Sequence, residues 1–370
     1  MYNFKVDSLR SATDGTHNAR VMAANDLVQR TLAQHGLVSP LSGAVDGQAG
    51  AVPSSVPPVV VNPMAGFKTP FTGAAAQHVV IPEGAEFRQE QFSCEAGSRS
   101  YRTYIPSSAT IGVTGIVVML HGCTQNPEDF ALGTGMNQLA EKHRFVVIYP
   151  QQSRGDNAQS CWNWFSRGDQ HRDRGEPAIL AGMTRKVMAE QGVPKEKTCV
   201  AGLSAGAAMA VILGETYPDV FCAVGAHSGL PLGVARDVPS AFAAMAGNAN
   251  MPEAANRVSE APAVRTIVFH GSADATVHPS NGDGIARHIR ARGAQLTIET
   301  DEQGRTSGRS FSRKIIATAQ GTTELEHWVV DGLGHAWSGG QPEGSYTDTQ
   351  GPDASAEMVR FFFESGNHKG

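Results

Sequence analysis

One serine in this chain has the surroundings that nucleophilic catalysis requires. Ser204 lies at the centre of the pentapeptide Gly202-Leu-Ser-Ala-Gly206, between an apolar run at 198–201 and a run of helical character at 207–213. A strand that enters a G-x-S-x-G turn and continues into a helix exposes its serine hydroxyl, because the glycines allow a sharp bend. The hydroxyl becomes a good nucleophile only when a neighbouring base removes its proton. The rest of the sequence must therefore supply that base and a carboxylate to orient it.

An acidic residue downstream of Ser204 follows a second apolar run. Residues 265–271 predict a buried strand, and Asp274 lies at its exit. Serine hydrolases built on this turn carry their triad in the order serine, acid, histidine. The other acidic candidates are predicted at a helix start, in a polar loop and before a strand (Asp283, Asp301 and Asp219). Asp274 is therefore the predicted triad acid.

The base is expected among the histidines that follow Asp274. His335 lies in Gly332-Leu-Gly-His-Ala-Trp-Ser-Gly339, directly after the last predicted strand, where a glycine-rich loop can bring an imidazole onto the serine. His278 follows the acid by only four residues, which is too close to complete a triad. Other downstream histidines are predicted in a helix, in a strand and at the chain end (His288, His327 and His368). We therefore predict a triad of Ser204, Asp274 and His335.

Backbone groups are the predicted source of oxyanion stabilisation. An apolar run at 116–120 ends in His121-Gly-Cys-Thr-Gln125. In serine hydrolases with this turn, a loop after an early strand supplies one N–H donor and the residue after the nucleophile supplies the other, here Cys123 and Ala205. Losing one donor from a comparable site costs about 3 to 4 kcal/mol of transition-state stabilisation. For His121 we expect a core position, with its ring bonded to a loop carbonyl.

Apolar runs typical of strands alternate with segments typical of helices along most of the chain. After an early antiparallel strand at 99–106, strands are predicted near 116–121, 145–150, 198–203, 220–227, 265–270 and 324–331. Helices are predicted near 133–143, 176–191, 205–216, 283–292 and 353–364. This alternation indicates an α/β fold with a mostly parallel central sheet and helices on both faces.

Five separated motifs together resemble those of one family. They are His121-Gly-Cys-Thr-Gln125, Cys161-Trp-Asn-Trp-Phe165, Gly202-Leu-Ser-Ala-Gly206, Phe269-His-Gly-Ser-Ala-Asp274 and Gly334-His-Ala-Trp-Ser-Gly339. In this order they resemble the polyhydroxybutyrate (PHB) depolymerase-like esterases of the α/β-hydrolase superfamily, which include feruloyl and acetylxylan esterases. The resemblance covers residues 87 to 365.

That resemblance implies an α/β-hydrolase fold and a serine carboxylic-ester hydrolase that works through an acyl-enzyme. The implied substrates are short-chain 3-hydroxyalkanoate polyesters or their oligomers, and the implied triad is Ser204, Asp274 and His335. A feruloyl or acetylxylan-type esterase is the alternative. A non-catalytic binding protein on a hydrolase scaffold is a more distant one, because such proteins typically lose triad members and this chain retains all three.

Two segments leave predicted strand ends at the edge where open α/β sheets bind ligands, residues 151–175 and 230–262. They and the loop of His335 carry aromatic residues. An aromatic-walled substrate pocket is one interpretation, and packing in the core is the other. The pocket candidates are Trp162, Trp164, Trp337 and His227.

The five cysteines leave at least one thiol unpaired. Cys123 and Cys161 both belong to predicted active-site loops, so a disulfide between them is a candidate brace for the oxyanion loop. Cys199 and Cys222 lie on strands that are candidate neighbours, where a free pair and a bridge are both open, and Cys94 is expected to be unpaired. None has C-x-x-C spacing, so we expect no metal site, and the triad chemistry needs no cofactor.

The composition agrees with a soluble enzyme, and the partner that the resemblance implies is an ester substrate. With 41% apolar and 18% charged residues, 370 residues suffice for one large domain and additional segments. A net charge of −5 gives no basic footprint for nucleic acid. No apolar run approaches the ~18 residues of a membrane-spanning helix, so we expect no membrane insertion.

The chain divides into three predicted parts. Residues 1–38 are expected to form an N-terminal helical segment, 39–86 a linker or strap rich in proline, glycine and alanine, and 87–366 the catalytic domain. The first residues lack the apolar core of a signal peptide. Members of the resembled family are commonly exported, so an extracellular and a cytoplasmic location both remain open.

Overall fold

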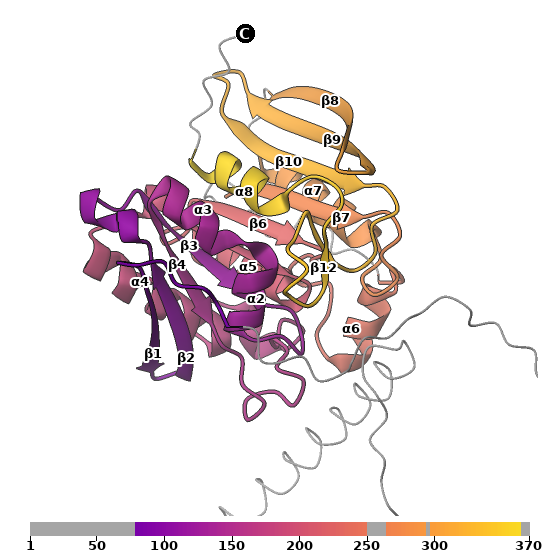
Figure 1. Ribbon diagram of the computed structural model, residues 1–370. Coiled ribbons are helices and arrows are strands. Elements are labelled where there is room, and N and C mark those ends of the chain that lie inside the picture. Colours follow the sequence, from indigo (N-terminus) through magenta and orange to yellow (C-terminus); the bar gives the residue numbers. More distant parts are fainter. Residues whose placement is uncertain (1–77, 250–263, 294–296, 364–370) are drawn as a thin grey trace, which may run out of the picture.

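The computed structural model describes residues 78–249, 264–293 and 297–363 (Figure 1). Within these ranges, ten strands form one sheet in the order β1-β2-β4-β3-β5-β6-β7-β10-β9-β8. The strands are β1 (Glu86–Cys94), β2 (Gly97–Ile105), β3 (Gly115–Leu120), β4 (Phe145–Pro150), β5 (Thr198–Leu203), β6 (Ala223–His227), β7 (Arg265–Gly271), β8 (Thr297–Thr306), β9 (Arg309–Thr318) and β10 (Thr323–Val330). Two short strands, β11 (Trp337–Ser338) and β12 (Thr347–Asp348), pair separately.

The centre of the sheet is parallel and its ends are antiparallel. Strands β4, β3, β5, β6, β7 and β10 run parallel to one another. Antiparallel β1 and β2 extend one end of the sheet, and the β8–β9 hairpin extends the other (Figure 1). Strands β3, β4 and β5 are buried at every position, as expected for strands covered on both faces. The predicted parallel strands are therefore confirmed.

Helices cover both faces of the sheet, and each face has its own core. Because side chains alternate along a strand, Val118 of β3 packs on one face and its neighbour Val117 on the other. The first core includes residues of α4, α5, α6 and α7, and the second includes residues of α2, α3 and α8. The helices are α2 (Pro127–Thr134), α3 (Met136–His143), α4 (Gly175–Gln191), α5 (Ala205–Thr216), α6 (Val238–Met245), α7 (Ser280–Arg292) and α8 (Ala354–Phe363).

Three details of the fold differ from the prediction. The helix expected at 133–143 is two helices that meet at Gly135, whose left-handed backbone (φ 62°) ends α2. Strand β1 precedes the predicted early strand and was not expected. Asp301, predicted in a polar loop, lies in β8, which is almost wholly exposed and so lacks the apolar alternation by which a strand is recognised.

The predicted N-terminal segments fall largely outside the described residues. Residues 1–38 are not among them, and the predicted linker at 39–86 is represented only from residue 78. Strand β1 begins at Glu86, one residue before the predicted start of the catalytic domain. Over the described ranges, no helix is both long enough and apolar enough to cross a membrane.

Candidate active site

Ser204 occupies a strained turn between β5 and α5. Its backbone angles (φ 57°, ψ −118°) lie outside the regions that side chains other than glycine favour. Two backbone hydrogen bonds hold this turn: the Ser204 N–H donates to the His227 carbonyl at 2.9 Å, and the Ser204 carbonyl accepts from the Ala208 N–H at 2.9 Å. The serine is 8% exposed. The sequence-predicted nucleophile therefore stands at a strand end with its turn secured on both sides.

The two glycines of the pentapeptide lie against backbone with no room for a side chain. A Cβ atom on Gly206 would lie 2.0 Å from the Leu120 carbonyl oxygen, and one on Gly202 would lie 2.4 Å from the carbonyl carbon of Gly206. Either contact is shorter than real Cβ atoms allow, so only glycine fits. This close approach packs the start of α5 onto the end of β3, and it brings the loop after β3 beside Ser204.

The buried Asp274 and the partly buried His335 form a hydrogen-bonded pair. The Nδ1 atom of His335 lies 2.8 Å from Oδ2 of Asp274. The other carboxylate oxygen, Oδ1, accepts from the backbone N–H groups of Thr276 (3.0 Å) and Val277 (2.9 Å). Burial opposes ionisation of Asp274, but the hydrogen bond from His335 and the other contacts outweigh it and lower its pKa to about 2. Because an ionised carboxylate can only accept, His335 carries its proton on Nδ1, and Nε2 is left as an acceptor.

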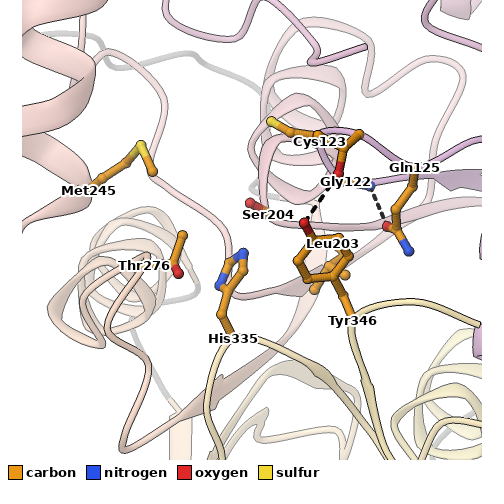
Figure 2. A pocket seen from close by; sticks show the side chains of 10 residues that line it. Gly122, Cys123, Gln125, Leu203, Ser204, Met245, Thr276, His335 and Tyr346 are labelled. Carbon is orange, nitrogen blue, oxygen red and sulfur yellow. Dashed lines mark hydrogen bonds between the residues drawn. The ribbon is translucent and has the colours of Figure 1, made fainter. Parts of the chain in front are cut away.

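Ser204 and His335 line the same cavity, with Asp274 behind the histidine. Figure 2 shows a ring nitrogen of His335 turned toward Ser204, with Met245 and Thr276 on one side of the imidazole and Tyr346 on the other. The cavity holds about 50 Å³ of free space, enough for a few water-sized groups. Its remaining lining residues are Gly122, Cys123, Thr124, Gln125 and Leu203. The structure thus brings the three predicted triad residues together.

Other histidines near Asp274 are already bonded elsewhere. His270 is fully buried, with Nε2 2.8 Å from the Val277 carbonyl oxygen. The same Nε2 lies 3.6 Å from Asp274 Oδ2, a neighbour of the acid that the sequence analysis missed. The ring of His278 bonds through Nδ1 to the Ser280 hydroxyl at 2.9 Å. Among these three histidines, only His335 lines the cavity with Ser204.

The two predicted oxyanion donors are unused by the rest of the described protein. Neither the Cys123 N–H nor the Ala205 N–H donates to an acceptor in the described residues. Cys123 lines the cavity, and Ala205 is the first residue of α5. The positive end of a helix dipole at Ala205 favours a negative charge there. These two groups are therefore available to an oxygen that acquires charge beside Ser204.

Gln125 holds the loop that carries Cys123. Its Oε1 accepts from the Gly122 N–H at 2.9 Å, and its Nε2 donates to Asp129 Oδ2 and to the Ser345 carbonyl, each at 3.0 Å. Gln125 belongs to a sequence motif that assigns it no role. Its partner Ser345, in the segment after His335, is 220 residues away along the chain, so only the fold reveals this brace.

A disulfide joins Cys123 to Cys161, the pairing that the sequence analysis left as a candidate. It ties the oxyanion loop to the segment that follows β4. The other three cysteines are free. Cys94, which was predicted to be unpaired, is exposed, and the sulfur atoms of Cys199 and Cys222 lie 3.4 Å apart without a disulfide bond.

Removal of this disulfide should affect both stability and turnover. Cys161→Ser opens a loop of 38 residues and should lower the free energy of unfolding by about 3 to 4 kcal/mol in the chain-entropy model. Ester kcat should fall as well, because the Cys123 donor loses a brace. Thermal melting and steady-state kinetics measure the two effects, with the exposed Cys94→Ser as control. Peptide mapping without reduction that finds Cys123 and Cys161 as separate free thiols would exclude the bridge.

The predicted aromatic pocket wall needs correction, because its residues are buried behind the cavity and do not line it. Trp162 Nε1 donates to the His121 carbonyl at 3.1 Å. Trp337 Nε1 donates to Ser355 Oγ at 3.0 Å. These large apolar rings are buried where the loops leave the core, and they fill space between helices and strands. The four former pocket candidates outside the lining are Trp162, Trp164, Trp337 and His227.

Two buried histidines hold the loops of the site in place through hydrogen bonds. His227 stacks on Phe269 and on Trp337, and its Nε2 accepts from the Ser338 N–H at 3.0 Å, which anchors the loop of His335. His121 bonds through Nδ1 to the Gly122 carbonyl at 2.8 Å, which confirms its predicted core role. Burial lowers the pKa of His121 to about 4 and that of His227 to about 3, so both rings are neutral.

No metal centre is found in the described part of the chain. It contains no group of three or more histidine, cysteine, aspartate or glutamate side chains arranged to hold an ion.

Comparison with known proteins identifies the family. A family model described as esterase PHB depolymerase matches residues 99–307, more than half of the chain, and the chain belongs to this family. It is 32% identical to poly(3-hydroxyalkanoate) depolymerase C of Paucimonas lemoignei over 253 residues, which cover 66% of this chain and 60% of that protein. It is 30% identical to a probable acetylxylan esterase A of Aspergillus fumigatus over 192 residues, 48% of this chain and 51% of that protein.

The fold also matches a solved structure. An acetyl xylan esterase from Aspergillus awamori aligns with a TM-score of 0.57 and 19% sequence identity, over 74% of this chain and 98% of that one. At this identity the match concerns the fold alone, and it confirms the predicted α/β-hydrolase architecture. The chain spans about half to three fifths of the length of the two curated relatives named above.

Proposed function

We propose that this chain is a serine carboxylic-ester hydrolase that works through an acyl-enzyme. The observation that carries the proposal is the Asp274–His335 pair, which faces Ser204 across one cavity beside two unused backbone N–H groups. Family membership supports it. A binding protein on the same scaffold would not need a serine in a strained turn opposite a hydrogen-bonded histidine–carboxylate pair, because strain of this kind is costly to maintain.

Acylation begins when His335 Nε2 removes the Ser204 proton as Oγ attacks the ester carbonyl carbon. The carbonyl oxygen becomes an alkoxide, and the N–H groups of Cys123 and Ala205 donate to it. Asp274 holds the imidazole in the required tautomer and stabilises its positive charge. The C–O bond to the leaving group then breaks, and the alcohol departs with the proton from His335.

Deacylation repeats these steps with water. His335 takes a proton from a water molecule as the water oxygen attacks the acyl carbon. A second alkoxide then forms and accepts from the N–H groups of Cys123 and Ala205. The bond from the acyl carbon to Ser204 Oγ breaks, and His335 returns the proton to Oγ. The carboxylic acid leaves, and the enzyme is restored with no cofactor.

The substrate class we propose is short-chain 3-hydroxyalkanoate polyesters or their oligomers. The family model and the relative named as a poly(3-hydroxyalkanoate) depolymerase support this class. The limited free space, bordered by Leu203, Met245 and Tyr346, suits a short acyl group. Acetylxylan-type deacetylation is the second candidate, because several relatives are named acetylxylan esterase A and an acetyl group is smaller still.

A substrate panel tests both the proposed ester hydrolysis and the proposed substrate class. The purified full chain is assayed with p-nitrophenyl esters of increasing acyl length, hydroxybutyrate oligomers, a ferulate ester and acetylated xylan. We expect the highest kcat/KM among the natural substrates on hydroxybutyrate oligomers, and a decline as the acyl chain lengthens. Faster turnover of acetylated xylan or ferulate would reject the substrate class, and no turnover of any ester would reject the hydrolase.

A further inference from the structure

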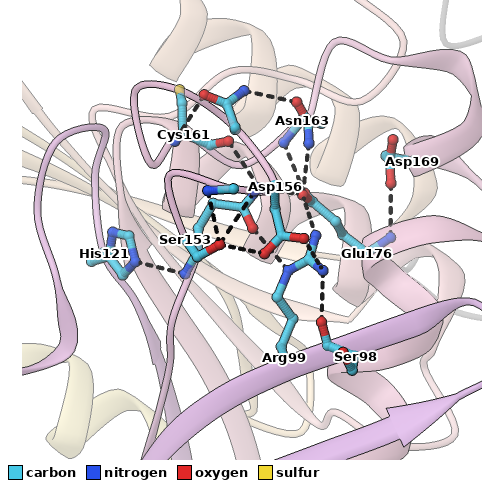
Figure 3. A network of polar contacts seen from close by, with 12 residues as sticks. Ser98, Arg99, His121, Ser153, Asp156, Cys161, Asn163, Asp169 and Glu176 are labelled. Carbon is cyan, nitrogen blue, oxygen red and sulfur yellow. Dashed lines mark hydrogen bonds and ion pairs between the residues drawn. The ribbon is translucent and has the colours of Figure 1, made fainter. Parts of the chain in front are cut away.

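A buried carboxylate that the proposed mechanism does not use lies beside the segment that carries Cys161. Glu176, in the first turn of α4, is 2% exposed. Its Oε2 accepts from the Asn163 N–H at 2.8 Å. Its Oε1 accepts from Asn163 Nδ2 at 2.8 Å, from Arg99 Nη2 at 3.2 Å and from Gln152 Nε2 (Figure 3). Every one of these partners is a donor.

Gln152 forms the first connection from this carboxylate to the active-site loops. Its side-chain amide also donates to the Cys161 carbonyl at 3.1 Å. Its backbone N–H donates to Nε2 of His121 at 3.1 Å, at the start of the oxyanion loop. Hydrogen bonds through Gln152 therefore connect Glu176 to both cysteines of the disulfide. The connection to Cys161 runs through the Gln152 side-chain amide, and the connection to Cys123 runs through His121, where the loop of Cys123 begins.

Asn163 forms the second connection. Its Oδ1 accepts from Asn157 Nδ2 at 2.9 Å. The Asn157 Oδ1 atom accepts from the Gln159 N–H (3.0 Å) and the Cys161 N–H (3.3 Å). The Gln159 carbonyl then accepts from the Thr124 N–H at 2.7 Å. This path ends one residue from the proposed oxyanion donor of Cys123.

Two charged groups contact Glu176, each from a different element, and a third charged group, Asp156, pairs with one of them. Arg99 of β2 also donates through Nε to Gln152 Oε1 and through Nη1 to Asp156, a carboxylate of the segment after β4. Asp169, in a short 3₁₀ turn (Arg167–Gln170), accepts the Glu176 N–H through Oδ1 at 2.7 Å. Arginine and the amide donors favour the ionised carboxylate, whereas burial and Asp169 oppose it.

We propose that Glu176 is a positioning residue for the oxyanion donor. Its ionised side chain holds Gln152 and Asn163 in place, and through them fixes the loop of Cys123. This inference rests on the proposed ester hydrolase function, because it assigns a role within the same reaction. An N–H donor is effective only when it is fixed in the position that the alkoxide will occupy.

The protonation state of Glu176 should control this positioning. Burial, followed by the charge of Asp169, raises the pKa of Glu176 to about 7 against the opposing contacts of Asn163, Arg99 and Gln152. Below pH 7 the carboxyl gains a proton, and its O–H then points at a donor instead of accepting from it. Above pH 7 all four donors are satisfied. The loop should therefore be held best in mildly alkaline solution.

The test compares Glu176→Gln with wild type and with Glu190→Gln across pH. Glutamine has the shape of a protonated glutamate, so it copies the low-pH state at every pH. The Glu190→Gln control makes the same chemical change on the same helix, at a surface glutamate that pairs with Lys186. We expect wild-type kcat to exceed that of Glu176→Gln about tenfold at pH 8.5 and to approach it near pH 5.5, with KM unchanged.

The ratio of the two kcat values isolates Glu176, because the pH dependence that comes from the rest of the protein is common to both enzymes and cancels. The ratio of wild type to Glu190→Gln should stay near one throughout. A wild-type to Glu176→Gln ratio that does not change with pH would overturn the proposal, since a merely structural glutamate would lower kcat equally at all pH values.

A readout that needs no turnover separates this inference from the proposed function. Hydrogen–deuterium exchange should be faster in peptides covering 121–125 and 151–163 of Glu176→Gln than in Glu190→Gln. Unchanged exchange would overturn the positioning role even if the wild type hydrolyses no ester, an outcome that would separately reject the function.

Asn157→Ala keeps the test open if Glu176→Gln fails to fold. It breaks the second connection without disturbing the buried charge. We expect faster exchange in 121–125 and a lower kcat than wild type. If the exchange rate in 121–125 and kcat both equal those of the wild type, the hydrogen-bonded connection does not fix the loop of Cys123, and the proposal is contradicted.

Discussion

Replacement of Ser204 by alanine should lower ester kcat by about 10⁴-fold or more and leave the fold intact. In the proposed mechanism the Ser204 hydroxyl forms the acyl-enzyme, and removal of a triad nucleophile leaves only the contribution of substrate binding and the oxyanion donors. The thermal midpoint should stay close to that of the wild type, because the alanine removes a single oxygen atom. Steady-state kinetics and circular dichroism measure the two quantities.

A matched control for this experiment is Ser310→Ala, on β9 and outside the cavity lining. It should retain wild-type kcat. Residual activity of Ser204→Ala above roughly a thousandth of the wild type would be inconsistent with covalent catalysis at this residue.

Asp274→Asn should lower kcat by about 10⁴-fold with little change in KM. The Oδ1 atom of Asp274 accepts two backbone N–H groups, so the amide oxygen of asparagine is drawn to that side. Its NH₂ group then faces His335 Nδ1, which must accept instead of donate. The ring proton moves to Nε2, and the imidazole can no longer take a proton from Ser204.

The controls for the acid are Asp283→Asn and Asp331→Asn, two carboxylates that do not touch His335. Both variants should keep kcat within a few-fold of wild type. A larger loss in either of them than in Asp274→Asn would show that the triad acid is misassigned. Because the pKa of Asp274 is lowered to about 2, this carboxylate stays ionised above pH 4, and loss of wild-type activity between pH 4 and 7 must come from other groups.

The parallel half of the fold was predictable because burial on both faces leaves a clear pattern in the sequence. Strands such as β3 and β4 are uninterrupted apolar runs. The β8–β9 hairpin was missed for the opposite reason. Its strands carry charged side chains paired across the hairpin, such as Lys314 with Glu299, and β8 is almost wholly exposed, so no apolar alternation marks it in the sequence.

The residues expected to perform the chemistry were predictable, and those that support them were not. Ser204, Asp274 and His335 follow strand ends, and strand ends are recognisable in the sequence. Gln125 and Glu176 each bond to a partner far along the chain, Ser345 and Arg99 respectively, and no local spacing reveals those contacts. For the tryptophans the sequence left pocket wall and core packing both open, because aromatic residues next to an active-site motif pack in the core as readily as they line a cavity, and the structure places them in the core.

The most direct measurement of the central claim is labelling of the intact protein with a serine-reactive phosphonate, followed by peptide mass spectrometry. Such a reagent forms a stable bond to a hydroxyl that a neighbouring base has activated. We predict a single adduct, on Ser204, that is absent from Ser204→Ala and strongly slowed in Asp274→Asn. An adduct on any other residue, or ester turnover by a protein that forms no adduct at Ser204, would contradict the account.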